Sequence, residues 1–426
     1  MCALVAGATG PHEEKPERKM IQGDQTRDGI RRSRCVTGQQ DIVFSIEPIG
    51  ALDELEREWR RLEIEASPSF FVSWNWIGTL LEMVPPEAKP RLLRGTAAGR
   101  TVALAVLGDA EIRRRRIIRA RRWVLNATGD PALDCVHLEH NGLLAEPQIG
   151  WDGLLDAFAA TKEVDEISLP GVAAPPPASL VEERGLLRGE APELSFAVEL
   201  GALSASGGDV AAILSHNARS QLRRAMHKLE PLRIEAAASE GEALAFFRIL
   251  KELHVPWWER RGLPHAFVHQ FFERFHERLI ERGFAEGAIQ LLRVSSGDRT
   301  LGILYNFHRA ARVYAYQSGF VQPEAHERPG VIAHALAIHR AWQEGDEIYD
   351  FMAGENRLKR SFGNRTETLS WTVVQKPRLR FRAEHRLLGD SRRTTSPYEL
   401  VRRNSPANRS GVHYVNGSRT DQPGGK

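Results

Sequence analysis

Residues 316–364 have the sequence YQSGFVQPEAHERPGVIAHALAIHRAWQEGDEIYDFMAGENRLKRSFGN, and this stretch decides the fold. Its apolar spacing predicts a helix over residues 331–344, which Pro329-Gly330 opens and Gly345 ends. A strand of the buried type follows at residues 347–352. The start of such a helix offers unpaired backbone N–H groups and the positive end of the helix dipole. The pattern therefore suits a phosphate-bearing ligand, although Pro-Gly also opens ordinary helices.

Strands precede this helix in the chain. Residues 288–294, 300–307 and 312–319 have strand length and are separated by short turns, which predicts an antiparallel meander. Further elements are expected on either side, namely helices over 209–229, 240–260 and 264–282 and strands over 232–237 and 368–375. Strands and helices mixed in this way indicate an α/β protein.

The first half of the chain alternates in a similar manner. The predicted helices cover residues 51–66, 74–84 and 151–161, with Ser73 as the N-cap of the second. The predicted strands cover residues 41–47, 91–95, 100–108, 116–120, 123–126, 136–139 and 166–169. The 426 residues are too many for one ordinary core and suit two domains.

Polar and Gly-rich segments set the expected boundaries. We predict a disordered leader over residues 1–40 and a disordered basic tail over 391–426. Between them, the N-terminal domain is expected over 41–200 and the C-terminal domain over 209–378, with the boundary near residues 201–208.

Composition excludes several classes of protein. Apolar residues make up 42% and charged residues 27%, as in a globular protein, and the net charge of +3 does not by itself indicate nucleic acid. No apolar run approaches the length of a transmembrane helix and no signal-like start is present, which predicts a cytoplasmic location. The three cysteines are scattered and indicate neither disulfides nor a zinc site.

Residues 316–364 resemble the C-terminal domain of the BioF2-like acetyltransferases, which include the CelD-type proteins of cellulose and exopolysaccharide gene sets. They are similar, more distantly, to the Fem-type aminoacyltransferases, which are two tandem GNAT domains. The likeness is specific here and looser over the rest of residues 42–377. The positions that carry the pattern are Tyr316, Gly319, Pro329, Gly330, Gly345, Tyr349, Asp350, Phe351, Gly354, Lys359, Phe362 and Gly363.

This resemblance implies two tandem GNAT-like domains, each a mixed, mainly antiparallel sheet flanked by helices, with a split central sheet. It implies transfer of an acyl group from acetyl-CoA or another acyl-CoA to an amine or hydroxyl, with no permanently bound cofactor. The expected acceptor is a sugar or an exopolysaccharide or cell-envelope precursor. The usual Gly-rich pyrophosphate loop is replaced by EAHERPG at residues 324–330, so acyl transfer is better supported than coenzyme A as the donor.

The donor site is predicted around the strand end and the helix start. Ser318 and Gly319 would contribute backbone groups near the thioester, and Pro329, Gly330 and Val331 would face the donor's phosphates. Lys359 and Arg360 would neutralise a phosphate. The alternative for these two cations is a solvated basic helix.

Three residues are predicted to carry the chemistry. Asp350, at a strand end, is the expected general base, and its alternative is an aspartate that caps the following turn. Tyr305 and Tyr316 would donate to the leaving thiolate, whereas strand tyrosines are more often core residues with a hydrogen-bonded tip.

The acceptor is expected to contact Arg219, Arg223, Trp258 and Tyr349. Arg219 and Arg223 belong to a strongly basic helix that is equally well explained as a surface helix. Core packing is the common fate of tryptophans such as Trp258.

Other residues were weighed for metal and nucleic acid. His326, His334 and His339 lack ligand spacing, so no metal site is expected. RRRRIIRARR at residues 113–122 predicts a strand–turn–strand with solvated arginines and no DNA binding.

Two alternatives to acyl-CoA chemistry stay open: a Fem-like transferase that uses aminoacyl-tRNA, and a non-catalytic assembly factor of a polysaccharide system. The oligomeric state is not predicted.

Overall fold

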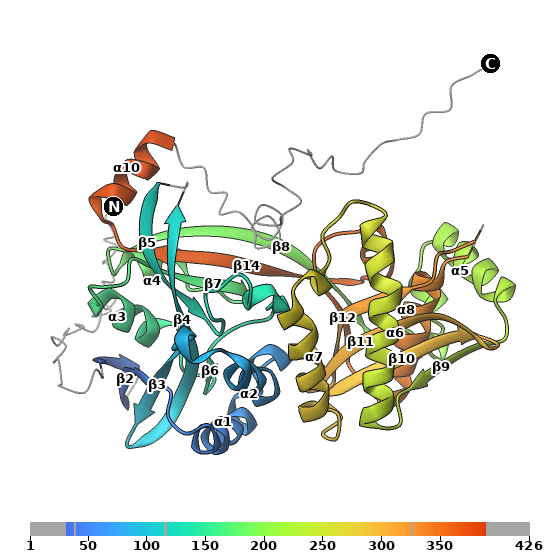
Figure 1. Cartoon of the computed structure of the whole chain (residues 1–426), viewed down its shortest axis with the longest axis horizontal. Coiled ribbons are helices and arrows are strands. Elements are labelled where there is room, and N and C mark those ends of the chain that lie inside the picture. Colours follow the sequence, from blue (N-terminus) through green and yellow to red (C-terminus); the bar gives the residue numbers. More distant parts are fainter. Residues whose placement is uncertain (1–30, 38–39, 115–116, 325–326, 389–426) are drawn as a thin grey trace, which may run out of the picture.

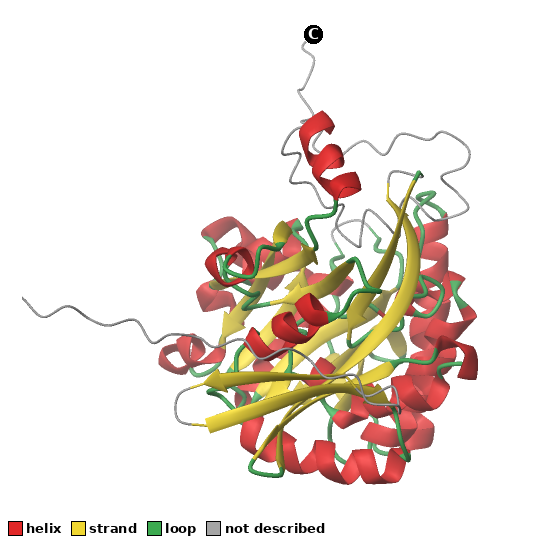
Figure 2. Ribbon diagram, turned by 90° about the vertical axis from the view of Figure 1, so that its left-hand side faces the viewer, coloured by secondary structure: helices red, strands yellow, loops and turns green. Residues whose placement is uncertain are grey.

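A computed structural model describes residues 31–37, 40–114, 117–324 and 327–388. Its strands form one sheet in the order β1-β2-β3-β4-β5-β7-β14-β8-β13-β12-β11-β10-β9, and β6 pairs with β4. Neighbouring strands are antiparallel except for β5 with β7 and β12 with β13. Figure 2 shows the twisted strands passing through the molecule with helices around them. The predicted mixed α/β class, mainly antiparallel and flanked by helices, is confirmed.

The two halves repeat one order of elements (Figure 1). The first half contains β2 (Gln40–Pro48), α1 (Leu52–Ala66), α2 (Trp74–Met83), β3 (Arg91–Ala97), β4 (Arg100–Arg114), β5 (Ile118–Leu125), β6 (Leu144–Ala145), α3 (Asp152–Ala160), β7 (Glu166–Val172), α4 (Ala178–Glu182) and β8 (Leu187–Glu199). The second half contains α5 (His216–Lys228), β9 (Leu232–Ala236), α6 (Glu240–Glu259), α7 (Gln270–Gly283), β10 (Ile289–Ser296), β11 (Arg299–Arg309), β12 (Arg312–Phe320), α8 (Pro329–Glu344), β13 (Ile348–Ala353), α9 (Arg357–Phe362) and β14 (Arg365–Gln375). Helix α10 (Leu379–Leu388) ends the described chain.

Each half gives its last strand to the other. Strand β8, which ends the first half, pairs with β13 of the second half, and β14, which ends the second half, pairs with β7 of the first. The two exchanged strands also pair with each other from Arg365 opposite Ala197 to Gln375 opposite Leu187. The domain boundary near residues 201–208 stays a prediction, but the exchange joins the predicted domains through a continuous main-chain ladder.

An aromatic core fills the space between the halves. Phe70 of the first half stacks on Phe307 of β11 with ring centroids 4.2 Å apart, and Trp76 of α2 packs edge-on against Phe275 of α7 at 4.9 Å. Figure 1 shows α2 beside α7 at this junction. Because these side chains are buried on both sides, the halves share one hydrophobic core as well as one sheet.

Several sequence predictions need correction. Residues 31–37, assigned to the disordered leader, form strand β1 (Arg31–Thr37) against β2. Residues 1–30 and the predicted tail at 391–426 lie outside the described residues. Residues 136–139 are not a strand, because Asp134–Val136 is a 3-10 helix that leads into a loop. This loop is held by Asp134, whose carboxylate accepts from the backbone of Thr128 and Gly129 at 2.7 Å each.

Strand β8 was not predicted, since its first residues are only partly buried and show no clean alternation. Ser73 does precede α2, but its hydroxyl donates to the Phe70 carbonyl at 2.6 Å instead of capping the helix. The Glu63 carboxylate accepts from the Trp74 amide in its place. Among the described helices, none combines the length and apolar character needed to span a bilayer.

Phe307→Ala is expected to lower the free energy of unfolding by about 3–5 kcal/mol, because it removes a fully buried ring between the halves. Urea denaturation measures the change. Ile64→Ala, at a side chain that is 83% exposed, should change it by less than about 0.5 kcal/mol. Equal effects of the two substitutions would contradict a shared core.

Candidate active site

Strands β12 and β13 begin as a parallel pair and then diverge. Their register covers only Arg312–Tyr314 opposite Ile348–Asp350. On its other side β12 contains a bulge, since Ala315 faces Asn306 and Gln317 faces Tyr305, which leaves Tyr316 between two pairs. The split central sheet implied by the resemblance is therefore present at this point, which we call the splay.

The backbone of Ser318 lies at the splay and is held by side chains. Its N–H donates to Oε1 of Gln317 at 3.1 Å, and its carbonyl oxygen lies 2.9 Å from Nδ1 of His254 on α6. Helix α6 packs directly on the next residue, Gly319, where a Cβ atom would lie 2.4 Å from the Leu250 carbonyl oxygen. Glycine is thus required at 319 by the close approach of the helix.

The loop after β12 brings the chain to the N-terminus of α8. Pro329 occupies the first turn, and Arg328 at the N-cap makes no side-chain cap. Glu327 organises the loop: it pairs with Arg299 at 3.0 Å and accepts from the Glu324 amide at 3.0 Å. Arg299 chiefly, and the Glu324 amide next, lower the pKa of the Glu327 carboxyl, and Lys228 at the end of α5 contributes. The helix ends at Gly345 in the left-handed region, as predicted.

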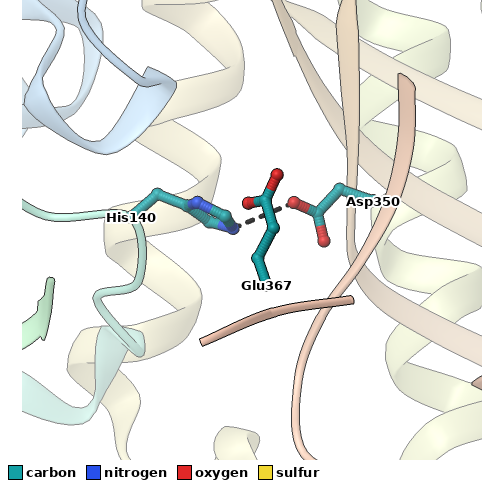
Figure 3. Close-up of side chains that lie close together, drawn as sticks. All are labelled: His140, Asp350 and Glu367. Carbon is teal, nitrogen blue, oxygen red and sulfur yellow. Dashed lines mark ion pairs between the residues drawn. The ribbon is translucent and has the colours of Figure 1, made fainter. Parts of the chain in front are cut away.

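A buried ionic cluster marks the start of the splay (Figure 3). Asp350 Oδ2 accepts from Nη2 of Arg312 at 2.6 Å and lies 2.9 Å from Nε2 of His140. The same Arg312 nitrogen donates to Glu367 at 2.8 Å, and Ser195 donates to Asp350 Oδ1 at 3.2 Å. We call these five residues the Asp350 cluster. His140 comes from the first half, Asp350 from β13, and Ser195 and Glu367 from the exchanged strands.

Both carboxylate oxygens of Asp350 are already engaged, Oδ1 by Ser195 and the Met352 amide and Oδ2 by Arg312 and His140, so neither is placed to take a substrate proton. Burial alone would raise the pKa of its carboxyl, but His140 and Arg312 hold that pKa well below its usual range. Oδ1 also accepts from the Met352 amide at 2.7 Å, which resembles the turn-capping alternative. The ionised carboxylate thus anchors the strand end, and we do not propose it as a base.

Three cluster residues, His140, Asp350 and Glu367, have ligand atoms close enough to hold a metal ion. Arg312 already lies between the two carboxylates and supplies the positive charge. Two other histidines of the second half have different partners: His334 contacts the Tyr349 hydroxyl at 2.9 Å and His339 contacts the Gly208 carbonyl at 2.9 Å. His326 lies outside the described residues.

Lys359 ties down the end of β13. Its Nζ donates to the carbonyls of Met352 and Ala353 at 3.0 and 2.5 Å, and Glu139 of the first half accepts from the Ala353 amide at 2.6 Å. Burial lowers the pKa of the Lys359 ammonium, while Glu139 opposes that shift. Met352 adopts a φ of +67°, so these contacts hold an irregular backbone. Exposed Arg360 pairs with Glu355. In the structure Lys359 thus holds the backbone of β13, and its predicted phosphate contact stays a prediction.

The hydroxyls of both predicted catalytic tyrosines contact His276, and Tyr305 is fully buried whereas Tyr316 is half-buried. Tyr305 OH lies 3.2 Å from Nδ1 of His276, and Tyr316 OH lies 3.2 Å from its Nε2 and donates to the Val136 carbonyl. Burial raises the pKa of Tyr305 well above its usual value. These contacts fit the alternative of core tyrosines with hydrogen-bonded tips.

Of the four predicted acceptor contacts, the structure brings one to the splay. Trp258 packs 5.6 Å from the His254 ring, centroid to centroid. Arg219 donates to the Ala211 carbonyl at 2.9 Å and so caps the short 3-10 helix Val210–Ile213. Arg223 is exposed near Asp209, and Tyr349 is buried against His334.

His254 was missed in the sequence. It lies in the run HVPWW, and no local spacing distinguishes it from a core histidine. Its bond to Ser318 joins residues 64 positions apart. Only the packing of α6 across β12 reveals it.

Within the basic run at residues 113–122, the described residues of β4 and β5 pair as antiparallel strands, with Arg113 opposite Arg119 and Arg114 opposite Ile118; residues 115–116 lie outside the described residues. Several of its arginines are paired: Arg121 with Asp109 at 2.6 Å, and Arg114 and Arg122 with the buried Glu166 at 2.9 and 2.6 Å. This neutralisation weakens the reading of the run as an RNA-facing surface.

Comparison with known proteins gives one family match and several similar structures. Residues 215–360 match the family described as an acetyltransferase (GNAT) domain. A comparison with curated proteins gave no match. The crystal structure of FemX is similar with a TM-score of 0.52 and 10% identity over 80% of this chain and 98% of that one. At this identity the likeness shows a shared fold.

Two further similar structures have TM-scores below 0.5. The C-terminal domain of a putative lysylphosphatidylglycerol synthetase from Agrobacterium fabrum has a TM-score of 0.49 and 12% identity over 79% of this chain and 95% of that one. A tandem GNAT protein from the clavulanic acid biosynthesis pathway has a TM-score of 0.42 and 13% identity over 77% and 98%. The match to the acetyltransferase (GNAT) family lies within the second half of the chain, where it covers residues 215–360.

Arg312→Met is expected to cost about 3–5 kcal/mol of unfolding free energy, because it leaves the buried Asp350 carboxylate without its guanidinium partner. Urea denaturation measures the loss. Arg223→Met, at an exposed pair, is the matched control and should cost less than about 1 kcal/mol. A small loss for Arg312→Met would show that the Asp350 cluster contributes little.

Asp350 should also make the fold sensitive to acid. Its pKa is lower in the folded state, so its stabilisation is present at neutral pH and is lost as the pH falls below the ordinary value of about 4. Between pH 7 and pH 3, the wild type should therefore lose more unfolding free energy than Asp350→Asn. Denaturation at several pH values tests this, with Asp298→Asn at an exposed turn as control. If the unfolding free energies of the wild type and Asp350→Asn fall equally between pH 7 and pH 3, Asp350 does not cause the acid sensitivity.

Proposed function

We propose that the chain transfers an acyl group from acyl-CoA to an amine or hydroxyl, with the donor lying along the splay. The observation that carries this is the position of the splay. Strand β12 leaves β13 after Tyr314, exposes the backbone around Ser318, and leads directly to the N-terminus of α8. An extended thioester therefore has a strand edge for its acyl end and a helix start for its phosphates.

The Ser318 amide supports a role in polarising the thioester carbonyl. Its N–H is held by the flexible side chain of Gln317, which a ligand oxygen could displace. A backbone donor fixed in a sheet needs no reorganisation when charge develops on that oxygen. Gly319 contributes by allowing α6 to pack closely behind this edge.

The start of α8 supports diphosphate binding. Its first-turn N–H groups and helix dipole favour negative charge. The Arg299–Glu327 pair holds the preceding loop, and Pro329, Gly330 and Val331 form the first turn. This arrangement supplies what a Gly-rich loop would otherwise provide.

The acceptor is proposed from the resemblance to the BioF2-like, CelD-type proteins: a sugar or an exopolysaccharide or cell-envelope precursor. Trp258 at the splay is consistent with a saccharide ring, which aromatic side chains contact well.

Acetyl-CoA is expected to raise the melting temperature, by an amount equivalent to about 2.7 kcal/mol at a concentration of 100 times its Kd. Arg328→Asp and Arg328→Ser should both cap α8, but only the first places a negative charge where the diphosphate would bind. Arg328→Asp should weaken acetyl-CoA binding at least about tenfold more than Arg328→Ser.

Calorimetric titration of the folded variants measures this difference, and thermal denaturation without ligand checks that both caps are tolerated. The absence of any acetyl-CoA binding by the wild type would refute the proposed donor and favour the non-catalytic alternative. Equal acetyl-CoA affinities of the two variants would show that the diphosphate does not bind at the N-terminus of α8.

A further inference from the structure

His254 lies at the splay and is fixed from several sides. Its side chain comes from α6, is only 5% exposed, and packs against Trp258 and Phe267 with ring centroids 5.6 and 5.5 Å away. Nδ1 lies 2.9 Å from the Ser318 carbonyl oxygen. The ring therefore has one orientation relative to the strand edge on which the thioester is proposed to bind.

The partner of Nδ1 determines the tautomer. A backbone carbonyl can only accept, so Nδ1 carries the proton and donates it to Ser318. In a neutral imidazole, the lone pair then belongs to Nε2. Burial lowers the pKa of the His254 imidazole to about 4, although the bond to Ser318 opposes this, and His265 and His137 add to the lowering. The ring is thus neutral near pH 7 and able to accept a proton.

The two backbone groups of Ser318 relate this ring to the chemistry. The N–H of this residue is the proposed donor to the thioester oxygen, and its carbonyl holds His254. His254 lies on the α6 side of this strand edge, and this is the side on which we place the acceptor. His137 of the first half reaches the same region, where its ring lies 6.4 Å from that of Phe272 on α7.

We propose that His254 is the catalytic base of the acyl transfer, taking the acceptor's proton on Nε2; this rests on the proposed function. The acceptor nitrogen or oxygen forms a bond to the thioester carbonyl carbon, and its proton passes to Nε2. The carbon–sulfur bond then breaks, and the leaving thiolate of coenzyme A takes the proton from the imidazolium. The products are the acylated acceptor and free thiol, and His254 returns to its neutral form.

A purely structural histidine would also bond to Ser318, and two substitutions separate the roles. His254→Asn keeps an N–H near the position of Nδ1 and can still hold the Ser318 carbonyl, but it lacks Nε2. His254→Gln places a polar group near Nε2 without the base. If both His254→Asn and His254→Gln lose turnover, and added imidazole restores turnover to His254→Ala, the residue acts as a base. If only His254→Gln loses turnover, the bond to the Ser318 carbonyl is the important contribution and the role is structural.

The first experiment follows thiol release from acetyl-CoA with water or glucosamine as acceptor. His254→Asn should lower kcat by about 10²–10⁴-fold with an unchanged KM for acetyl-CoA. His227→Asn, at an exposed position on α5, should behave as the wild type. Wild-type turnover by a folded His254→Asn would overturn the proposal.

A second experiment needs no acceptor. Diethyl pyrocarbonate modifies the lone-pair nitrogen of neutral histidines, and peptide mass spectrometry locates the product. We expect His254 to be modified and saturating acetyl-CoA to protect it. No modification, or modification that acetyl-CoA does not slow, would overturn the role of His254. Failure of acetyl-CoA to bind at all, seen by calorimetry, would instead overturn the proposed function.

Discussion

The exchange of the last strands between the halves is the constraint on which the rest of the structure depends. Strand β14 pairs with β8 along the whole of β14, and each of the two also pairs with a strand of the other half. Separating the halves would therefore break main-chain ladders and expose the aromatic core between Phe70 and Phe307. Two repeats of one element order thus behave as a single folded unit with one continuous sheet.

The strand exchange also positions the polar and charged side chains around Asp350, at the point where β12 and β13 diverge. Strand β8 brings Ser195 and β14 brings Glu367 to the side of Asp350, while a loop of the first half brings His140. These groups fix β13 where it leaves β12, and Glu139 and Lys359 fix its irregular end. The carboxylates of Asp350, Glu367 and Glu139 are therefore all engaged in contacts that hold this geometry. We therefore propose that the chemistry at the splay depends on backbone groups and on the His254 side chain of α6.

Local sequence patterns predicted most of the elements around the splay. The meander, the helix opened at Pro329 and closed at Gly345, and the following strand all occur, because turn geometry and apolar spacing are short-range properties. The same reasoning missed β8, whose residues are partly exposed and include Pro192. That strand forms because β13 and β14 supply hydrogen-bonding partners on both of its edges, and no property of its own sequence records those partners.

The sequence by itself determined the α/β class, the repeated order of strands and helices, and the region of the proposed donor site. The tertiary structure decided what each polar side chain there can do. Asp350 was predicted to be a base, and in the structure its carboxylate is paired with Arg312 and His140, which hold its pKa well below its usual range. The position of His254 depends on the packing of α6 across β12, which brings its Nδ1 next to the Ser318 carbonyl. Protonation and hydrogen bonding depend on neighbours that lie far away in the chain, and folding alone brings those neighbours together.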